Sequence, residues 1–135
     1  MPLMFVEAPE GLGREAKAQL LSALSTAIDK TYHFPDTRVF LREYPADNVC
    51  QDGEIGSGPI RPVGFLEAPE LSSVEAKRQL VIELQAAIAE AYGAIADVEQ
   101  SLILINQYPL ENVGWLNQLQ SDNAMIVEAV RALNA

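Results

Sequence analysis

The feature of this sequence that most constrains its fold is an internal repeat. The segment Pro2–Glu10 recurs as Pro62–Glu70, with Phe and the run Glu-Ala-Pro-Glu at the same places in both copies. The match continues without a gap as far as Tyr32 in the first copy and Tyr92 in the second. Self-similarity over this length indicates that one supersecondary unit occurs twice in tandem.

The repeat also divides the chain. After a short insertion the match resumes, and Tyr44-Pro45 and Asn48-Val49 recur as Tyr108-Pro109 and Asn112-Val113. We therefore predict a first repeat over residues 2–52, a glycine-rich linker over residues 53–60, and a second repeat over residues 61–120. A C-terminal helix is expected over residues 121–134, opened by Ser121-Asp122. The 135 residues have room for one core, so residues 1–135 are expected to form a single domain.

Each copy has the pattern of a strand, an amphipathic helix and a returning strand. Residues 2–8 alternate weakly and contain Phe and Val, which favours a strand. Apolar residues then recur at every fourth position, which indicates the buried face of a helix. These residues are Ala16, Leu20, Leu24, Ile28 and Tyr32 in the first copy, and Ala76, Leu80, Leu84, Ile88 and Tyr92 in the second. Ser72 followed by Glu75 predicts a cap on the second helix, and Pro35 and Gly93 mark the helix ends.

The returning strands are predicted at residues 37–44 and 99–108. Leu102–Ile105 is apolar on both faces, so we expect a central, buried strand there. A strand, a crossover helix and a returning strand pair in parallel. The predicted fold class is therefore α+β: a four-stranded sheet with two helices on one face, in which a pseudo-two-fold axis relates the units. Two helices cover only one face, so neighbouring subunits are expected to bury the other.

Charge narrows the possible partners. The formal net charge is -10 and the isoelectric point about 4.4. Nucleic acids and anionic membrane surfaces favour clustered Lys and Arg, so neither is expected as a partner. Cys50 is the only cysteine, which excludes an intramolecular disulfide. We see no signal peptide and no apolar stretch of transmembrane length, and we expect a cytoplasmic protein.

Three local patterns resemble the tautomerase superfamily, whose members begin at Met-Pro. Glu10-Gly11 and Lys17 are similar to the first turn and helix of 4-oxalocrotonate tautomerase. His33-Phe34 and the residues after it are similar to part of cis-3-chloroacrylic acid dehalogenase. Asn112–Trp115 resembles the C-terminal segment of macrophage migration inhibitory factor. Together these matches span most of the chain, which therefore resembles a fused, two-repeat member.

The resemblance implies that Pro2 becomes the N-terminal residue once Met1 is removed. A terminal proline is a secondary amine, whereas an internal proline such as Pro62 is a tertiary amide without useful basicity. An apolar surrounding lowers the pKa of a terminal amine below its reference value of about 8. A neutral amine can take a proton from carbon beside a carbonyl. We therefore expect a keto-enol tautomerase that uses Pro2 as general base on an enol or 2-oxo acid.

The resemblance also implies a homotrimer with a small-molecule substrate, and we expect no cofactor and no metal. Arginines are the candidates for binding a substrate carboxylate, because a guanidinium grips it with two hydrogen bonds. Arg38 matches the family's strand arginine, Arg42 shares its strand face, and Arg61 precedes the second repeat. Phe34 and Trp115 are candidates for an apolar pocket wall, although a subunit interface is the favoured place for Trp115.

Other positions depart from the family pattern. The family's first-turn arginine falls at Leu12, and the paired arginines of the dehalogenases fall in residues 67–71, which contain none. Dehalogenation is therefore not expected. Asp36 lies near an aspartate of the family's malonate semialdehyde decarboxylase but is expected in a surface turn. His33 is expected to cap the first helix.

Two alternatives stand beside this interpretation. The element order β-α-β-β-α-β is also that of ferredoxin-like domains, including dimeric α+β barrels. A chain with so few arginines could also keep the fold without the chemistry, as a trimeric scaffold or small-ligand binder. The first alternative differs from a fused tautomerase in the order of the strands in the sheet. The second has the same fold, but Pro2 performs no chemistry in it.

Overall fold

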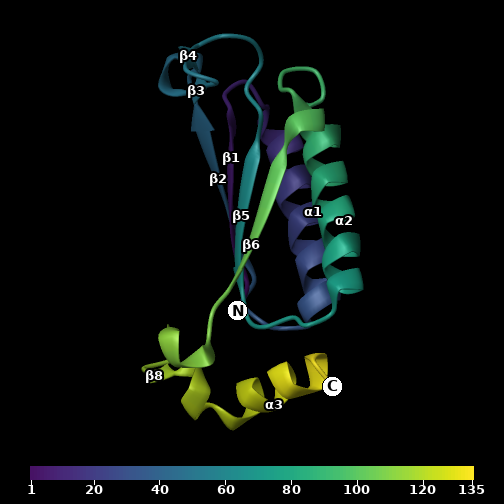
Figure 1. The fold of residues 1–135 in the computed structure, drawn as a ribbon, viewed down its shortest axis with the longest axis vertical. Coiled ribbons are helices and arrows are strands. Elements are labelled where there is room, and N and C mark those ends of the chain that lie inside the picture. The colour runs from purple at the N-terminus through teal and green to yellow at the C-terminus, as the bar shows by residue number, and fades with distance from the viewer.

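The computed structural model describes residues 1–135 as a four-stranded mixed sheet with two long helices on one face (Figure 1). The first repeat forms β1 (Leu3–Pro9), α1 (Arg14–Tyr32) and β2 (Arg38–Tyr44), and the second forms β5 (Val63–Ala68), α2 (Val74–Tyr92) and β6 (Leu102–Gln107). The smaller strands are β3 (Cys50–Gln51), β4 (Glu54–Ile55), β7 (Gly114–Trp115) and β8 (Gln118–Leu119). The 3-10 turns are η1 (Ala46–Asn48), η2 (Val98–Gln100), η3 (Leu110–Asn112) and η4 (Gln120–Asp122), and α3 (Ala124–Leu133) ends the chain.

The sheet confirms the predicted tandem architecture. Its strand order is β2-β1-β5-β6; β1 is parallel to β2, β5 is parallel to β6, and the two units meet where β1 runs antiparallel to β5. At this junction Phe5 lies opposite its repeat equivalent Phe65, so the pseudo-two-fold axis passes between them. The ferredoxin-like alternative is wrong, because that fold separates the two strands of each β-α-β unit, whereas here they are neighbours.

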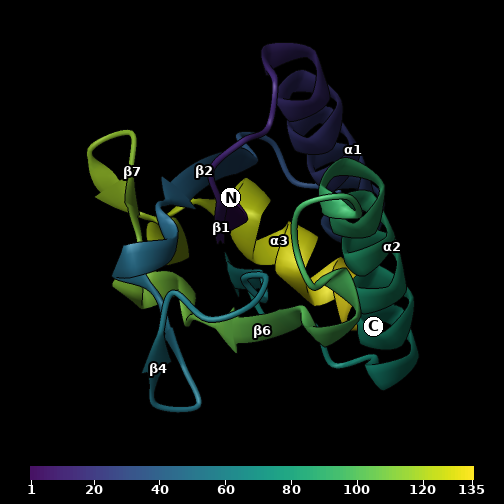
Figure 2. The same ribbon diagram turned by 90° about the horizontal axis from the view of Figure 1, so that it is seen from above.

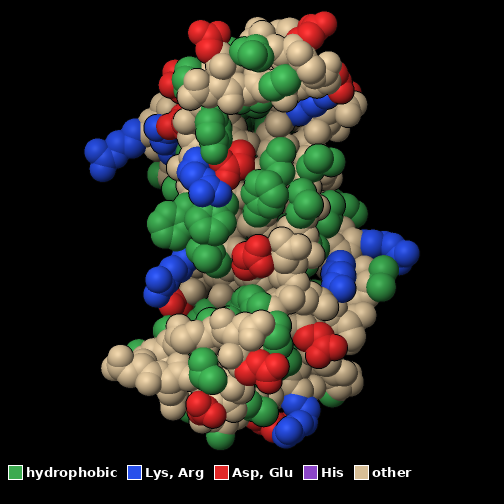
Figure 3. Space-filling view, turned by 60° about the vertical axis from the view of Figure 1, so that its left-hand side comes forward, with side chains coloured by type: hydrophobic (Ala, Val, Ile, Leu, Met, Phe, Trp, Pro, Cys, Tyr) green, Lys and Arg blue, Asp and Glu red, His purple; other side chains and the backbone are tan.

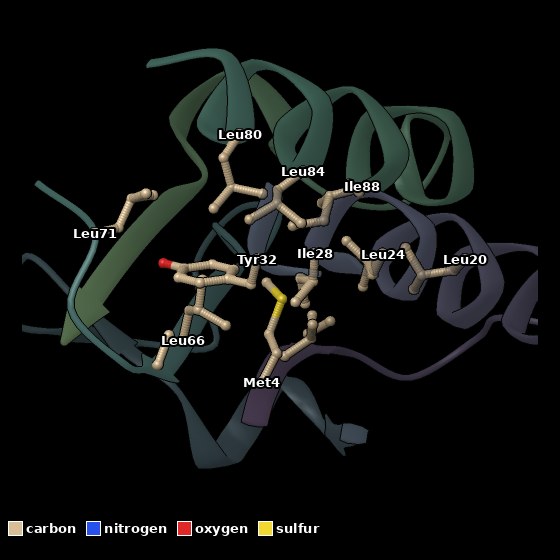
Figure 4. Packing of buried hydrophobic residues seen from close by; sticks show 14 of the residues in the cluster. Met4, Leu20, Leu24, Ile28, Tyr32, Leu66, Leu71, Leu80, Leu84 and Ile88 are labelled. Carbon is tan, nitrogen blue, oxygen red and sulfur yellow. The ribbon is translucent and has the colours of Figure 1, made fainter. Parts of the chain in front are cut away.

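The core lies between the sheet and the two helices, and it has the predicted residues (Figure 4). Both helices bury the face formed by every fourth residue, and Leu24 and Leu84 are fully buried at equivalent places. Tyr32 and Tyr92 are 1% and 0% exposed. The helices end at these tyrosines, as Pro35 and Gly93 predict.

The prediction that Leu102–Ile105 forms a central strand is wrong. β6 is an edge strand, with Ile103 and Ile105 packed toward the core and Leu102 and Leu104 60% and 41% exposed. The central strands are β1 and β5. The second apolar face of β6 therefore belongs to a sheet face that this chain leaves open.

The predicted helix caps are displaced by one or two residues. Ser73, rather than Ser72, caps α2 by accepting a hydrogen bond from the backbone of Ala76 at 3.1 Å. Asn123, rather than Ser121-Asp122, caps α3. Both corrections keep the expected chemistry, a short polar side chain that accepts from the first helical turn.

The repeat extends through the two hairpins. The insertion lies between α2 and β6, where residues 93–101 replace residues 33–37 of the first unit. Beyond it, Gly56 donates to the Val49 carbonyl at 3.2 Å, and Gln120 makes the equivalent bond to Val113 at 2.9 Å. The hairpins β3–β4 and β7–β8 thus occupy equivalent places, and β4 lies inside the predicted linker.

One pair of repeat-equivalent residues is complementary in size. Gly64 of β5 lies against its counterpart, Met4 of β1: a Cβ atom at position 64 would be 2.6 Å from Met4 Cε and 3.0 Å from Ile103 Cδ1. The methionine of one repeat therefore fills the space that the other repeat leaves empty.

The C-terminal helix α3 lies across the end of the sheet at which the chain begins (Figures 1 and 2). Its end is fixed to the loop before α2, because the Asn134 side chain accepts from the Ser72 backbone at 2.6 Å and donates to the Glu70 carbonyl at 2.9 Å. None of the helices combines the length and the apolar character that crossing a membrane would require.

Candidate active site

A pocket of about 220 Å³ lies where β1 begins. Its walls come from the N-terminal residues, the turn that leads into β2, the β7–β8 hairpin and η4. The lining residues are Met1, Pro2, Leu3, Asp36, Arg38, Val113, Gly114, Trp115 and Gln120. Three of the predicted site residues, Pro2, Arg38 and Trp115, therefore border one space.

The fold explains why these residues meet. Parallel pairing of β1 with β2 sets Arg38 beside the chain start, and the Arg38 backbone donates to the Pro2 carbonyl at 3.0 Å. The β7–β8 hairpin follows β6 and brings Trp115 to the same place. Residues from both ends of the chain therefore form the pocket.

Arg38 is held by Asp36. The guanidinium donates from Nε to Oδ1 at 3.1 Å and from an amino group to Oδ2 at 2.8 Å, and Asp36 has a left-handed backbone with φ of 60°. The hydrogen bond from Arg38 holds the pKa of Asp36 below its usual value, with a smaller lowering by Trp115. A guanidinium has five N–H donors in a planar fork, so the edge that faces away from Asp36 remains available for a carboxylate.

Burial makes the terminal amine at this end of the sheet a weaker base than a free N-terminus. Met1 is 9% exposed. Burial lowers the pKa of its amine from 8.0 to about 6, while the negative charge of Asp36 acts in the opposite direction. Pro2 is also buried. An amine in this place is therefore neutral over a wider pH range than a free terminus.

Gln120 is a buried amide in the pocket wall without a hydrogen-bond partner. It is 1% exposed, and neither Oε1 nor Nε2 is hydrogen-bonded. An unsatisfied buried polar group costs about 1–3 kcal/mol. Its position in the pocket wall makes it available to a bound molecule that brings its own polar atoms.

Gln120→Leu is expected to raise the free energy of unfolding by about 1–3 kcal/mol in the Met1-bearing protein, because an apolar side chain has no polar group to satisfy. Urea unfolding at fixed protein concentration measures the change. The matched control is Gln107→Leu, which should lower stability, because Gln107 Oε1 accepts from the Leu71 backbone at 2.9 Å. A loss of stability in Gln120→Leu would show that the amide has a partner in solution.

The other predicted binding residues lie elsewhere. Arg42 pairs with Glu7 and lies over the Phe5 ring, 4.4 Å from its centroid, on the open sheet face. Arg61 pairs with Asp52 of the β3–β4 hairpin at 2.8 Å. Phe34 is 6% exposed and belongs to the core. The structure does not bring these three residues to the pocket.

The equivalent place in the second repeat is filled by the chain itself. Gln51, the counterpart of Trp115, accepts from the Arg61 backbone at 2.7 Å and donates to the Pro59 carbonyl at 3.2 Å. Leu102 takes the place of Arg38. The polypeptide that leads into Pro62 is bound where the first repeat has its pocket.

Two residues that line the pocket, Asp36 and Gln120, were not predicted as site residues. Asp36 was assigned to a surface turn; it does lie in the loop after α1, but its side chain also borders the pocket. Gln120 gave no signal, because an isolated glutamine has no pattern. His33 ends α1 with φ of 58° and is exposed. No group of three or more His, Cys, Asp or Glu side chains is placed to hold a metal ion.

A second hollow, of about 330 Å³, lies between α1 and α2. Alanines form most of its wall, and Glu90 is its one charged residue. It contains none of the predicted site residues, so it is not the candidate active site.

Comparison with known proteins agrees with this geometry. No known family model matches the sequence, and no curated protein matches it. Among solved structures, native fused 4-OT is similar with a TM-score of 0.79 and 25% identity, over 90% of this chain and 98% of the other. A fused 4-OT described as a symmetric trimer has a TM-score of 0.72 and 27% identity, again over 90% and 98%. A protein inactivated by 2-oxo-3-pentynoate has a TM-score of 0.76 and 23% identity, over 89% and 96%.

The class defined by the fold is that of tandem β-α-β proteins with a pocket at the chain start. The chain has the tautomerase superfamily fold in its fused, two-repeat form.

Proposed function

We propose that this protein is a small-molecule tautomerase in which Pro2, exposed by removal of Met1, is the general base. The observation that carries the proposal is that Pro2 and Arg38 border one pocket at the end of the sheet where burial lowers the pKa of a terminal amine. A base with a lowered pKa beside a carboxylate-binding cation is the pairing that proton transfer on a 2-oxo acid requires.

In the proposed reaction the neutral Pro2 nitrogen takes a proton from one position of the substrate and returns it to another. Starting from the enol, the nitrogen removes the hydroxyl proton, and the electron pair forms the C=O bond. The C=C electrons then take the proton back at carbon from the ammonium group. No proton is gained or lost overall, so neither cofactor nor metal is required for balance.

The pocket also limits the substrate. Arg38 is the one cation among its lining residues, and a second carboxylate buried without a partner is costly. Trp115 offers an aromatic wall. The proposed substrate class is therefore an enol or 2-oxo monoacid, with an aryl compound such as phenylenolpyruvate as the first one to test.

Labelling with 2-oxo-3-pentynoate tests the role of the amine. The neutral nitrogen adds to C4 of the alkyne, its proton moves to C3, and the adduct carries the full mass of the reagent. We expect one label per chain on Pro2 of the Pro2-terminal protein, located by peptide mass spectrometry. Cys50 is an exposed thiol that could compete, so the experiment uses Cys50→Ser as background. Failure to label Pro2 in that background would contradict the proposal.

We further propose a homotrimer in which the open sheet face is buried. A row of apolar side chains crosses this face from Phe40 through Phe5 and Phe65 to Leu104, and Phe5 stacks on Phe40 at 5.7 Å between ring centroids. Figure 3 shows a band of hydrophobic side chains across this face of the molecule. Phe40 is 50% exposed in the single chain. Four of the similar fused 4-OT structures are described as trimers.

Leu104→Asp is expected to convert the trimer into monomers, because it places an unpaired charge in the buried apolar row. Analytical ultracentrifugation at micromolar concentration measures the change. The control is Ile82→Asp, which removes an exposed aliphatic residue from α2, away from the open face, and should leave the trimer intact. A wild-type protein that sediments as a monomer would contradict the assembly.

The scaffold alternative keeps one supporting observation: Arg38 already has an acidic partner in Asp36. If that pair only stabilises the turn, the pocket would bind a ligand without transforming it. Activity of the Pro2-terminal protein on an enol substrate separates the two functions.

A further inference from the structure

The Tyr108 hydroxyl is hydrogen-bonded to the carbonyl group that adjoins Pro2. Across a sequence separation of 107 residues, it donates a hydrogen bond of 3.0 Å to the Met1 carbonyl oxygen. The Met1 carbonyl carbon is covalently bonded to the Pro2 nitrogen. A carbonyl oxygen is therefore already bound beside the atom that the proposed function makes the base.

Removal of Met1 leaves this donor without an acceptor. Tyr108 is half-buried, and burial raises the pKa of its hydroxyl to about 12, so it stays protonated at ordinary pH. The space that opens lies directly against the Pro2 nitrogen. A substrate carbonyl that enters there can accept the hydrogen bond that Met1 gives up.

Comparison of the two repeats shows that Tyr108 departs from the symmetric arrangement. Its counterpart Tyr44 donates its hydroxyl hydrogen bond to Glu7 within the first repeat. The corresponding Glu67 instead accepts from the Asn106 amide at 3.1 Å. The Tyr108 hydroxyl is thus not bonded within its own repeat and instead reaches the start of the chain.

We propose that Tyr108 is a catalytic residue that donates a hydrogen bond to the substrate's carbonyl or enolate oxygen, in the place that the Met1 carbonyl occupies. The inference rests on the proposed function of Pro2. As Pro2 takes the proton from carbon, the C–H electron pair forms the C=C bond and the carbonyl π pair moves to oxygen. The Tyr108 hydroxyl then faces the developing negative charge, and a donor aimed at such an oxygen lowers the barrier to proton transfer.

The test compares Tyr108→Phe with Tyr44→Phe in Pro2-terminal protein. Tyr108→Phe should lower kcat by about 10²-fold, the usual effect of removing one oxyanion donor. The rise of kcat/KM with pH should stay in place, because it reports the amine of Pro2. Tyr44→Phe, which removes the same hydroxyl from the other repeat, should keep wild-type kcat.

Each outcome separates this inference from the proposed function. Full kcat in Tyr108→Phe, alongside an active Pro2-terminal wild type, would overturn the role of Tyr108 alone. Equal losses in both tyrosine variants would also overturn it, since the effect would then be structural. Equal activity of Met1-bearing and Pro2-terminal wild type would instead overturn the proposed function.

Stability provides a second readout. Tyr108→Phe should destabilise the Met1-bearing protein, which loses a hydrogen bond, more than the Pro2-terminal protein, in which the hydroxyl has no acceptor. Equal destabilisation of both forms would show that the hydroxyl has another partner, and this too would overturn the inference.

Discussion

Protein that retains Met1 is expected to be about 10²- to 10⁴-fold less active in enol–keto conversion than protein that begins at Pro2, which is the usual contribution of a general base. In the Met1-bearing chain the Pro2 nitrogen is a tertiary amide and cannot take a proton. Met1 also lines the pocket. The measurement is the rate of ketonisation of phenylenolpyruvate, followed by absorbance, with the N-terminus of each preparation verified by mass spectrometry.

Pro2→Ala serves as the control for this comparison. Its primary amine can still carry a proton, so part of the activity should remain. In the Pro2-terminal protein kcat/KM should rise with pH as the amine becomes neutral and should level off above its pKa. Burial places that pKa below the usual value near 8. Equal rates for the two N-termini would favour the binding-scaffold alternative.

Arg38→Ala is expected to lower kcat/KM by about 10- to 100-fold, mainly through KM, because a charge-assisted hydrogen bond to a carboxylate contributes about 1.5–3 kcal/mol. The variant also leaves Asp36 without its cation, so a negative charge would face the substrate. Steady-state kinetics on a 2-oxo monoacid measure the effect.

The double variant Arg38→Ala/Asp36→Asn separates these two causes. It should recover the part of the loss that comes from repulsion by Asp36, and leave the part that comes from the missing guanidinium. Arg78→Ala removes an exposed arginine of α2, paired with Glu75, and should leave KM unchanged. An unchanged KM in Arg38→Ala would show that the carboxylate binds elsewhere.

The repeat was sufficient to predict the main strands and helices and the parallel pairing within each unit, but not the two short hairpins or the antiparallel pairing of β1 with β5. The strand and helix periods recur in both copies, and a second copy doubles the evidence for each of these elements. The sequence did not distinguish an edge strand of the sheet from a central one, because Leu104 of the edge strand β6 is as apolar as a buried residue. Its outer face is open in the single chain and would be buried in the proposed trimer. A sequence does not distinguish burial by a neighbour from burial by its own chain.

The pocket was predictable only in part. Pro2 and Arg38 lie at the starts of two strands that were predicted to pair in parallel, so their meeting could be expected. Asp36 and Gln120 reach the pocket from a turn and a 3-10 helix, and Tyr108, just after β6, is hydrogen-bonded to Met1 beside the pocket. Their positions depend on side-chain direction and on contacts between distant segments, which no periodic pattern records.

The fit of Met4 into the space above Gly64 bears on the history of the chain. Two copies of the first repeat would bring two methionines to the sheet centre, where one already fills the space, and two copies of the second would leave a void. Each repeat should therefore pack better against the other repeat than against a second copy of itself. Separated halves are therefore expected to reassemble as mixed pairs rather than as pairs of identical halves.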